Sequence, residues 1–156
     1  MISIIVATDD NLLIGKKESS NGMPWNIPED LKHFKATTVN KTILMGVTTY
    51  KAIGRPLPNR KTIVVSLEPF EDDRVEVRDS LEAVIEEYRK SGEDLFISGG
   101  ASIYKQCLPN ADQLLISRIP GNHEGETYFP SFEEFGYQLI EEKPFETFTL
   151  QIYKRG

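Results

Sequence analysis

One carboxylate stands among apolar side chains in the stretch from Met23 to Phe34, which reads Met-Pro-Trp-Asn-Ile-Pro-Glu-Asp-Leu-Lys-His-Phe. Pro28 suits the first position of a helix, where its missing N–H costs nothing, so the spacing predicts a helix from this residue. On that helix Asp30 and Leu31 share a face with Phe34, because they precede it by four and three residues. An acid on an apolar face is costly without a cationic or hydrogen-bonding partner, which indicates a functional use for Asp30. The alternative is an acid at the rim that binds water or stabilises the positive end of the helix dipole.

Two glycines mark a second place where a ligand could approach the chain. A buried strand over residues 94–98 runs into Gly99 and Gly100, and a helix follows. This order places bare backbone N–H groups at the carboxyl edge of a sheet, where open α/β sheets bind pyrophosphate. The pattern is neither GxGxxG nor GxxxxGK(S/T), so a plain tight turn remains the alternative.

Gly46 occupies a similar junction, between a strand over residues 42–45 and a short helix over residues 47–53. A glycine at such a junction lets a ligand approach the backbone. Thr48 or Thr49 could cap the helix and offer N–H and hydroxyl groups to a phosphate. The junction alone does not identify the ligand.

Hydrophobic patterning predicts the elements that position these residues. Apolar or alternating runs predict about eight strands, over residues 1–7, 42–45, 61–66, 75–77, 94–98, 114–119, 137–142 and 147–153. Helices are predicted from Pro28 to about Thr38, over 47–53, from Asp79 to Gly92 with Asp79 and Glu82 in a capping-box-like arrangement, and after Gly100. This order predicts one α/β domain over residues 1–156, with a mainly parallel central sheet, helices on both faces and an antiparallel C-terminal edge hairpin. The long loop over residues 8–22 is expected to be a lid or a binding loop.

Composition limits the class of protein. The 156 residues suffice for one well-packed domain, and a net charge of −6 with a pI near 5.0 argues against nucleic acid or an acidic membrane as the partner. The single cysteine, Cys107, excludes an internal disulfide and a multi-cysteine metal site, and is expected to be buried in a helix. No basic leader and no bilayer-length apolar run is present, so the expected location is the cytoplasm. His33 and His123 are expected on the solvated surface, and no metal site is expected.

Six motifs, in the right order along the whole chain, together resemble dihydrofolate reductase. They are the N-terminal strand through Ile14-Gly15, the stretch from Met23 to Asp30, Met45-Gly46 with Thr49, the turn from Ile53 to Arg60, Ser98-Gly99-Gly100 with Tyr104, and residues 124–130. The resemblance implies the dihydrofolate-reductase-like fold and NADPH as cofactor. It implies reduction of 7,8-dihydrofolate to 5,6,7,8-tetrahydrofolate, by hydride transfer to C6 and protonation at N5. A monomer that binds dihydrofolate and antifolate inhibitors is expected.

The resemblance assigns the catalytic and substrate-binding residues. Asp30 would bind the 2-amino group and N3 of the pterin and tune the ring while a water carries the proton. Trp25 would belong to the same catalytic site and line the pterin pocket, and Arg60 would fork onto the glutamate α-carboxylate of the substrate. The other substrate-binding residues would be Ile5, Ala7, Leu31, Phe34, Ile53, Leu57, Ser98 and Ser117.

The resemblance also assigns the cofactor site. The two glycine junctions would hold the pyrophosphate, and other residues of the set would border the nicotinamide or the adenosine. The set is Ala7, Ile14, Gly15, Gly46, Val47, Thr48, Thr49, Ser66, Leu67, Arg78, Gly99, Gly100, Ala101, Ser102, Ile103 and Tyr104. Residues 9–27 would form a lid over the nicotinamide, supported by the loop that contains Gly125-Glu126.

Several residues depart from the family pattern. The lid carries extra residues around 17–21, and Glu126 stands where an aspartate is commoner. Ser98 replaces an aliphatic residue beside the substrate, as in some trimethoprim-insensitive members, which predicts weaker trimethoprim binding. Val47, Leu67 and Glu68 stand where the family often holds the 2′-phosphate of the cofactor. We therefore expect a preference for NADPH over NADH that is smaller than in relatives with an arginine at position 47.

Two other functions remain open from the sequence. A reductase of riboflavin synthesis shares the fold and the cofactor, but lacks the Pro-Trp to Asp helix and the Gly-Arg-Pro-Leu-Pro turn. The other is a folate- or nucleotide-binding protein without catalytic activity on the same scaffold. NADPH consumption with dihydrofolate separates these functions.

Overall fold

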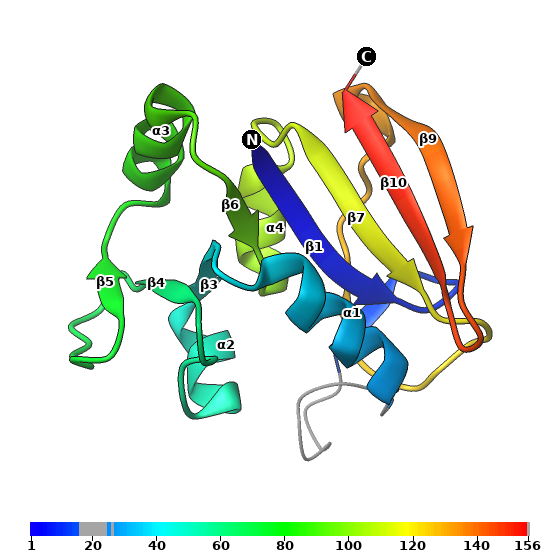
Figure 1. The fold of residues 1–156 in the computed structure, drawn as a ribbon, viewed down its shortest axis with the longest axis horizontal. Helices are drawn as coiled ribbons and strands as arrows, with labels where there is room; N and C mark the ends of the chain where they lie inside the picture. Colours follow the sequence, from blue (N-terminus) through cyan, green and yellow to red (C-terminus); the bar gives the residue numbers. More distant parts are fainter. Residues whose placement is uncertain (16–24, 26, 156) are drawn as a thin grey trace.

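An eight-stranded sheet forms the centre of the molecule, in the order β5-β4-β3-β6-β1-β7-β10-β9 (Figure 1). The computed structural model describes residues 1–15, 25 and 27–155. β10 pairs antiparallel with both β7 and β9, and the other neighbours in this sheet pair parallel. The strands are β1 (Ile2–Thr8), β3 (Thr42–Gly46), β4 (Lys61–Val65), β5 (Glu76–Arg78), β6 (Leu95–Ile97), β7 (Gln113–Arg118), β9 (Tyr137–Pro144) and β10 (Thr149–Arg155). The predicted mainly parallel sheet with an antiparallel C-terminal edge is confirmed.

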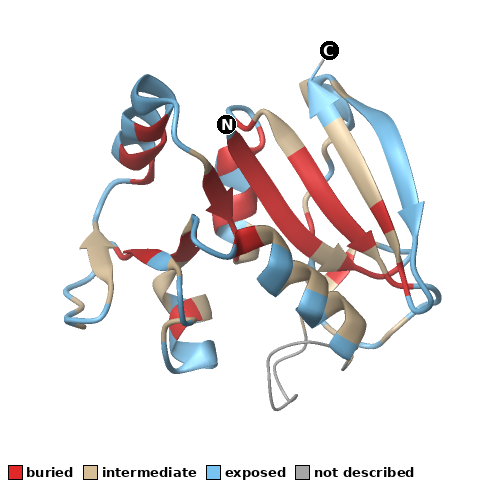
Figure 2. Cartoon of the chain, in the orientation of Figure 1, coloured by how far each residue is buried: buried red, intermediate tan, exposed pale blue. Residues whose placement is uncertain are grey.

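Helices cover both faces of the sheet, and each face has its own apolar core. The α1-side core contains Ile5, Phe96 and Phe148 and extends to α1 (Pro28–Thr38) and α2 (Val47–Ile53). The α4-side core contains Ile4 and Val6 and extends to α3 (Leu81–Ser91) and α4 (Ala101–Cys107). Alternate residues of β1 therefore serve opposite faces, as strand geometry requires. Figure 2 shows that the central strands are the most buried, whereas the edge strand β9 is largely exposed.

Helix ends agree with the sequence in part. Pro28 opens α1 as predicted, and Gly92 ends α3 with a left-handed φ of 74°. The N-cap of α3 is Ser80, which accepts a hydrogen bond from Ala83 N, so the predicted capping by Asp79 is wrong by one residue. The predicted capping of α2 by a threonine is also wrong. Gly46 is its N-cap and no side chain caps it, because Thr48 and Thr49 already lie inside the helix.

The sequence did not predict a second, two-stranded sheet. β2 (Leu13–Gly15) pairs antiparallel with β8 (Thr127–Tyr128), which lies more than a hundred residues later in the chain. Strands this short carry no detectable periodicity, so the pairing could not be read locally. A 3₁₀ turn, η1 (Glu133–Phe135), follows β8. Cys107 is buried in α4 as expected, and the helices in the described part of the chain are too short or too polar to cross a membrane.

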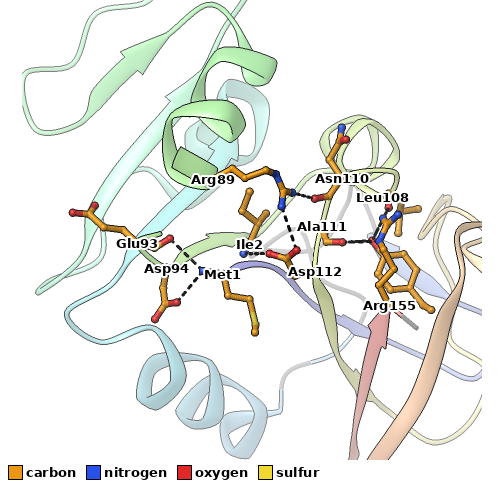
Figure 3. Close-up of polar contacts among 11 residues, drawn as sticks. Met1, Ile2, Arg89, Glu93, Asp94, Leu108, Asn110, Ala111, Asp112 and Arg155 are labelled. Atoms are coloured by element: carbon orange, nitrogen blue, oxygen red, sulfur yellow. Dashed lines mark hydrogen bonds and ion pairs between the residues drawn. The ribbon is translucent and has the colours of Figure 1, made fainter. Parts of the chain in front are cut away.

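Polar contacts tie both chain ends to the sheet edge opposite the carboxyl ends of the parallel strands (Figure 3). The Asp112 carboxylate accepts hydrogen bonds from Ile2 N at 2.8 Å and from Arg89 Nη1 at 3.3 Å. Arg155 of the last strand donates to the carbonyls of Leu108 and Ala111, at 2.6 and 3.1 Å. These bonds join β1, α3, α4 and β10 at one place.

Asp112→Ala is therefore expected to lower the free energy of unfolding by about 1–3 kcal/mol, because the part-buried Ile2 N–H loses its acceptor. Urea unfolding measures this change. Asp73→Ala, in an exposed loop, is the control and should change stability by less than about 0.5 kcal/mol. Equal stability of Asp112→Ala and wild type would show that these contacts contribute nothing.

Candidate active site

The carboxyl ends of four parallel strands bring the predicted site residues to one edge of the sheet. Ala7 of β1 pairs in register with Ser117 of β7. On the other side of β1, Ser98 N donates to Leu44 O at 2.9 Å, and Gly46 N donates to Gly99 O at 2.9 Å. The substrate and cofactor residues assigned by resemblance therefore meet at the edge where open α/β sheets bind ligands.

Asp30 lies half-buried on α1, close to the Ser117 hydroxyl of β7. Burial raises the pKa of the Asp30 carboxyl above its ordinary value, and the Ser117 hydroxyl and nearby His33 offset this only in part. Among the described residues no ion pair neutralises the group. Glu29 fixes the start of α1, because its carboxylate accepts from Thr147 N at 2.9 Å. Asp30 is thus a half-buried acid with capacity for further donors.

Apolar side chains pack on the α1 side of the sheet, which is the side of the helix that carries Asp30. Trp25, Phe34 and Leu57 pack with the buried Ile5 in the α1-side core. Leu31 and Ile53 remain 51% and 43% exposed, although both are large and apolar. Trp25 Nε1 is buried and has no hydrogen-bond partner among the described residues. This side of the sheet offers apolar contact together with the Asp30 carboxylate, which suits a flat heterocycle with N–H groups.

Arg60 lies at the far end of α1. Its Nε donates to Thr38 Oγ1 at 3.0 Å, while Nη1 and Nη2 donate to the carbonyls of Pro58 and Lys35. A guanidinium has five N–H donors in a fixed plane, so two remain for a ligand. The contacts hold the side chain at the end of the apolar surface, where a carboxylate on an extended substrate could reach it.

The two glycine junctions lie against each other and fit the phosphates of a dinucleotide. Gly99 has φ 120°, which L side chains rarely adopt, and a Cβ on Gly100 would lie 3.1 Å from Thr49 Oγ1. No side chain caps α2 or α4, so their first N–H groups are left for other acceptors. Bare backbone and uncapped N–H groups are what a pyrophosphate requires.

Other predicted cofactor residues differ in how accessible they are. Ile103 and Tyr104 are 9% and 5% exposed, and the Tyr104 hydroxyl donates to Ile5 O at 3.0 Å, so both mainly support α4. Val47 packs against the α1-side core. Ala101 and Ser102 begin α4, and Ser102 is exposed.

A cavity of about 490 Å³ lies at the ends of β4 and β5, and we call it the outer cavity. Its lining consists of Ser66, Leu67, Glu68, Pro69, Phe70, Val77, Arg78 and Asp79. Leu67 is 91% exposed, and the Ser66 hydroxyl donates to Glu68 O at 2.7 Å. The structure thus places the predicted residues Ser66, Leu67 and Arg78 around one cavity.

A buried acid that the sequence analysis missed holds the base of the predicted lid. Asp9 is 1% exposed, and its carboxylate accepts hydrogen bonds from the backbone N–H groups of Asn11, Leu13 and His123, at 2.8 to 2.9 Å. These bonds lower the pKa of Asp9 against the opposing effect of burial. Its position directly after a buried strand, at the carboxyl edge, was the available signal.

The lid itself lies only partly within the described residues. Residues 16–24 and 26, including the extra segment and the Met23-Pro24 motif, fall outside them. The described start of the lid contacts its expected support, because Glu126 N donates to Gly15 O at 3.2 Å. Ile14 and Gly15 therefore have a fixed place beside the loop that contains Gly125.

Comparison with known proteins agrees with this arrangement. A family model described as dihydrofolate reductase matches residues 1–155. This chain belongs to the dihydrofolate reductase family. Dihydrofolate reductase type 3 of Salmonella typhimurium is 42% identical over 142 residues, covering 90% of this chain and 85% of that protein. Dihydrofolate reductase of Bacillus subtilis is 43% identical over 141 residues, covering 90% and 82%.

A solved structure of dihydrofolate reductase from Enterococcus faecalis, complexed with NADP(H) and RAB-propyl, superposes with a TM-score of 0.91. It is 31% identical, and the match covers 99% of this chain and 96% of that one. The resemblance drawn from sequence motifs is confirmed. Neither a riboflavin-pathway reductase nor an inactive binding protein is favoured over dihydrofolate reductase by these matches.

The expectation that both histidines lie on the solvated surface is wrong for His33, whose Nε2 is buried, whereas the ring nitrogen of His123 contacts Pro120 O at an exposed position. His33 is half-buried on α1, and its ring lies 5.9 Å from those of Phe145 and Phe148. His123 is also half-buried and contacts the Trp25 ring edge-on, with ring centroids 5.3 Å apart. The sequence does not reveal these aromatic contacts, because the partners of each histidine lie far away along the chain.

Proposed function

We propose that this chain reduces 7,8-dihydrofolate to 5,6,7,8-tetrahydrofolate with NADPH, using the site described above. Family membership supports the reaction, and one observation supports the assignment of the site. Asp30 is a half-buried acid with a raised pKa, in an otherwise apolar surface next to two bare-backbone junctions. The 2-amino group and N3 of a pterin would supply the donors that this carboxylate lacks.

The chain's own residues would bind, orient and shield the reacting rings. Asp30 would hold the pterin by its N–H groups and favour protonation at N5 electrostatically, while a water delivers the proton. Phe34, Leu57 and Ile5 would exclude bulk water from the ring, and Leu31 and Ile53 would cover the rest of the substrate.

NADPH, when bound, supplies the hydride that C6 of the substrate accepts. The backbone around Gly46, Gly99 and Gly100 would hold its pyrophosphate, and the outer cavity would receive its adenosine end. Most of the rate enhancement would then come from holding two rings together in a dry site.

The proposal includes a single domain over residues 1–156, working as a monomer in the cytoplasm. One eight-stranded sheet runs through the molecule, and both apolar cores pack against it. This arrangement supports a single domain. The acidic composition supports a small-molecule enzyme rather than a partner of nucleic acid or membrane.

The direct test is NADPH consumption by the purified protein with dihydrofolate, with the ribosylamino-pyrimidine substrate of riboflavin synthesis as the comparison substrate. The proposal expects turnover with dihydrofolate and none with the pyrimidine. Turnover only with the pyrimidine, or binding of both ligands without turnover, would overturn it.

Ser98 gives a prediction about inhibitors. Its side chain is half-buried at the end of β6, and its hydroxyl makes only a long bond of 3.4 Å to Leu44 O. Ser98→Ile adds apolar contact for a flat diaminopyrimidine, so trimethoprim should bind about fivefold more tightly, equivalent to about 1 kcal/mol.

The inhibition constant for trimethoprim measures this effect, and Ser98→Ala is the matched control. Alanine removes the hydroxyl without adding contact and should give a smaller change. An inhibition constant unchanged in Ser98→Ile would exclude Ser98 as a contributor to trimethoprim resistance.

A further inference from the structure

The outer cavity contains a cation that two neighbouring carboxylates already bind. Arg78 Nη1 lies 3.2 Å from Glu76 Oε2 and 3.0 Å from Glu87 Oε2, and its side chain is 28% exposed. Glu87 comes from α3, whereas Glu76 precedes Arg78 on β5. Glu87 is 54% exposed, so its pairing with Arg78 competes with water and with any anion that enters.

The rest of the outer cavity is acidic. Glu68 and Asp79 are part of its lining, and Arg78 is the one Lys or Arg among these described lining residues. Lys61 does not compensate, because its Nζ lies 3.6 Å from the other oxygen of Glu76. Lys51 lies outside the lining, over the Phe70 ring at 5.6 Å. A phosphate dianion entering the cavity would therefore compete with carboxylates for one guanidinium.

The position of the cavity makes this competition relevant to the cofactor. Gly46 pairs in register with Val65, the last residue of β4, and the cavity lining begins at the next residue, Ser66. The junction that would hold a pyrophosphate is therefore next to the cavity that would receive an adenosine.

We propose that Glu87, together with Glu76, sets the affinity of this chain for adenosine ligands that carry a 2′-phosphate, by competing for Arg78. The inference rests on the proposed function, which places a dinucleotide at this edge. Glu87 is then a specificity-determining residue that weakens discrimination between NADPH and NADH. It acts through Arg78 and does not itself contact the ligand.

Calorimetric titration with 2′,5′-ADP and with 5′-AMP tests this directly, because neither probe requires turnover. Glu87→Gln should bind 2′,5′-ADP about five- to tenfold more tightly at low salt, with 5′-AMP unchanged within about twofold. High salt should reduce the gain, because exposed charges are screened. In an Arg78→Gln background the same substitution should give no gain.

Glu86→Gln is the matched control, since Glu86 is the preceding residue of α3 and pairs with Lys90 at 3.1 Å instead of with Arg78. It removes the same charge and should leave the binding of both probes unchanged. An equal gain in Glu86→Gln, a gain that persists without Arg78, or no gain in Glu87→Gln would each overturn the proposal. Loss of 2′,5′-ADP binding in Lys51→Gln but not in Arg78→Gln would also overturn it.

These outcomes are separate from the test of the proposed function. Turnover with dihydrofolate together with an unaltered 2′,5′-ADP affinity in Glu87→Gln would refute the role of Glu87 alone. Absence of turnover would refute the proposed function whatever the calorimetry shows.

Discussion

Asp30→Asn is expected to lower kcat/KM for dihydrofolate at pH 7 by about 10²–10³-fold. The amide keeps the shape of the carboxylate but has no charge. Its NH2 group is a donor and would face an N–H donor of the pterin. The substrate would lose both its binding partner and the negative charge that favours protonation at N5. Steady-state kinetics with saturating NADPH measures the change.

The same variant should recover part of its activity at low pH, where the substrate arrives already protonated. Wild type and Asp30→Asn should therefore differ less at acid pH than at neutral pH. Full activity of Asp30→Asn at neutral pH would remove this residue from the mechanism.

Asp30→Asn should lose activity but gain stability at neutral pH. Because the folded state raises the pKa of Asp30, its contribution to stability is fully present below the ordinary carboxyl pKa and is lost as pH rises through the raised pKa. The amide suffers no such loss, so the variant should have the larger free energy of unfolding at neutral pH. The difference should shrink at acid pH. Urea unfolding at both pH values tests this, and a variant less stable than wild type at neutral pH would contradict it.

Gly125→Ala is expected to lower kcat/KM by about ten- to a hundredfold, through displacement of Ile14 and Gly15, which the family resemblance assigns to the cofactor site. A Cβ on Gly125 would lie 2.4 Å from the carbonyl oxygen of Gly15 and 3.1 Å from Leu13 Cδ1. A backbone atom of a paired strand cannot rotate away, so β2 and the residue 120–126 loop must separate. Overpacking of this kind also costs about 1–3 kcal/mol of stability.

Gly136→Ala is the control for Gly125→Ala, because its φ of 80° makes the backbone costly but a Cβ there meets no atom within 4 Å. It should lose stability by about 1 kcal/mol while keeping its kinetics. Unchanged kinetics in Gly125→Ala would show that the contact between β2 and this loop does not support the site.

The sequence predicted the elements whose signals are local. Pro28 fixes the start of α1 by its own ring, and the apolar runs of the central strands are long enough to recognise. The acid on the apolar face of α1 was also visible, because helical spacing alone puts Asp30 beside Phe34. The family motifs, and not the helical spacing, predicted that this acid binds the pterin.

The parts that were missed depend on contacts between distant segments. β2 and β8 are three and two residues long and pair across more than a hundred residues, so neither has a pattern of its own. In the sequence Asp9 is an ordinary acid at the start of a loop. Only the structure shows that three backbone N–H groups donate to it, one of them from the distant His123. The partners of Arg78 likewise come from β5 and α3, which the sequence alone does not place together.

The central claim is that this edge of the sheet brings the two rings together for direct hydride transfer, with Asp30 holding the acceptor. Reaction of dihydrofolate with NADPH deuterated at the transferred C4 position, followed by NMR of the product, tests it most directly. We expect the product of both wild type and Asp30→Asn to carry one deuterium at C6 of tetrahydrofolate. At neutral pH, Asp30→Asn should form this product orders of magnitude more slowly than wild type. A product without deuterium at C6, or equal rates for the two proteins, would contradict the claim.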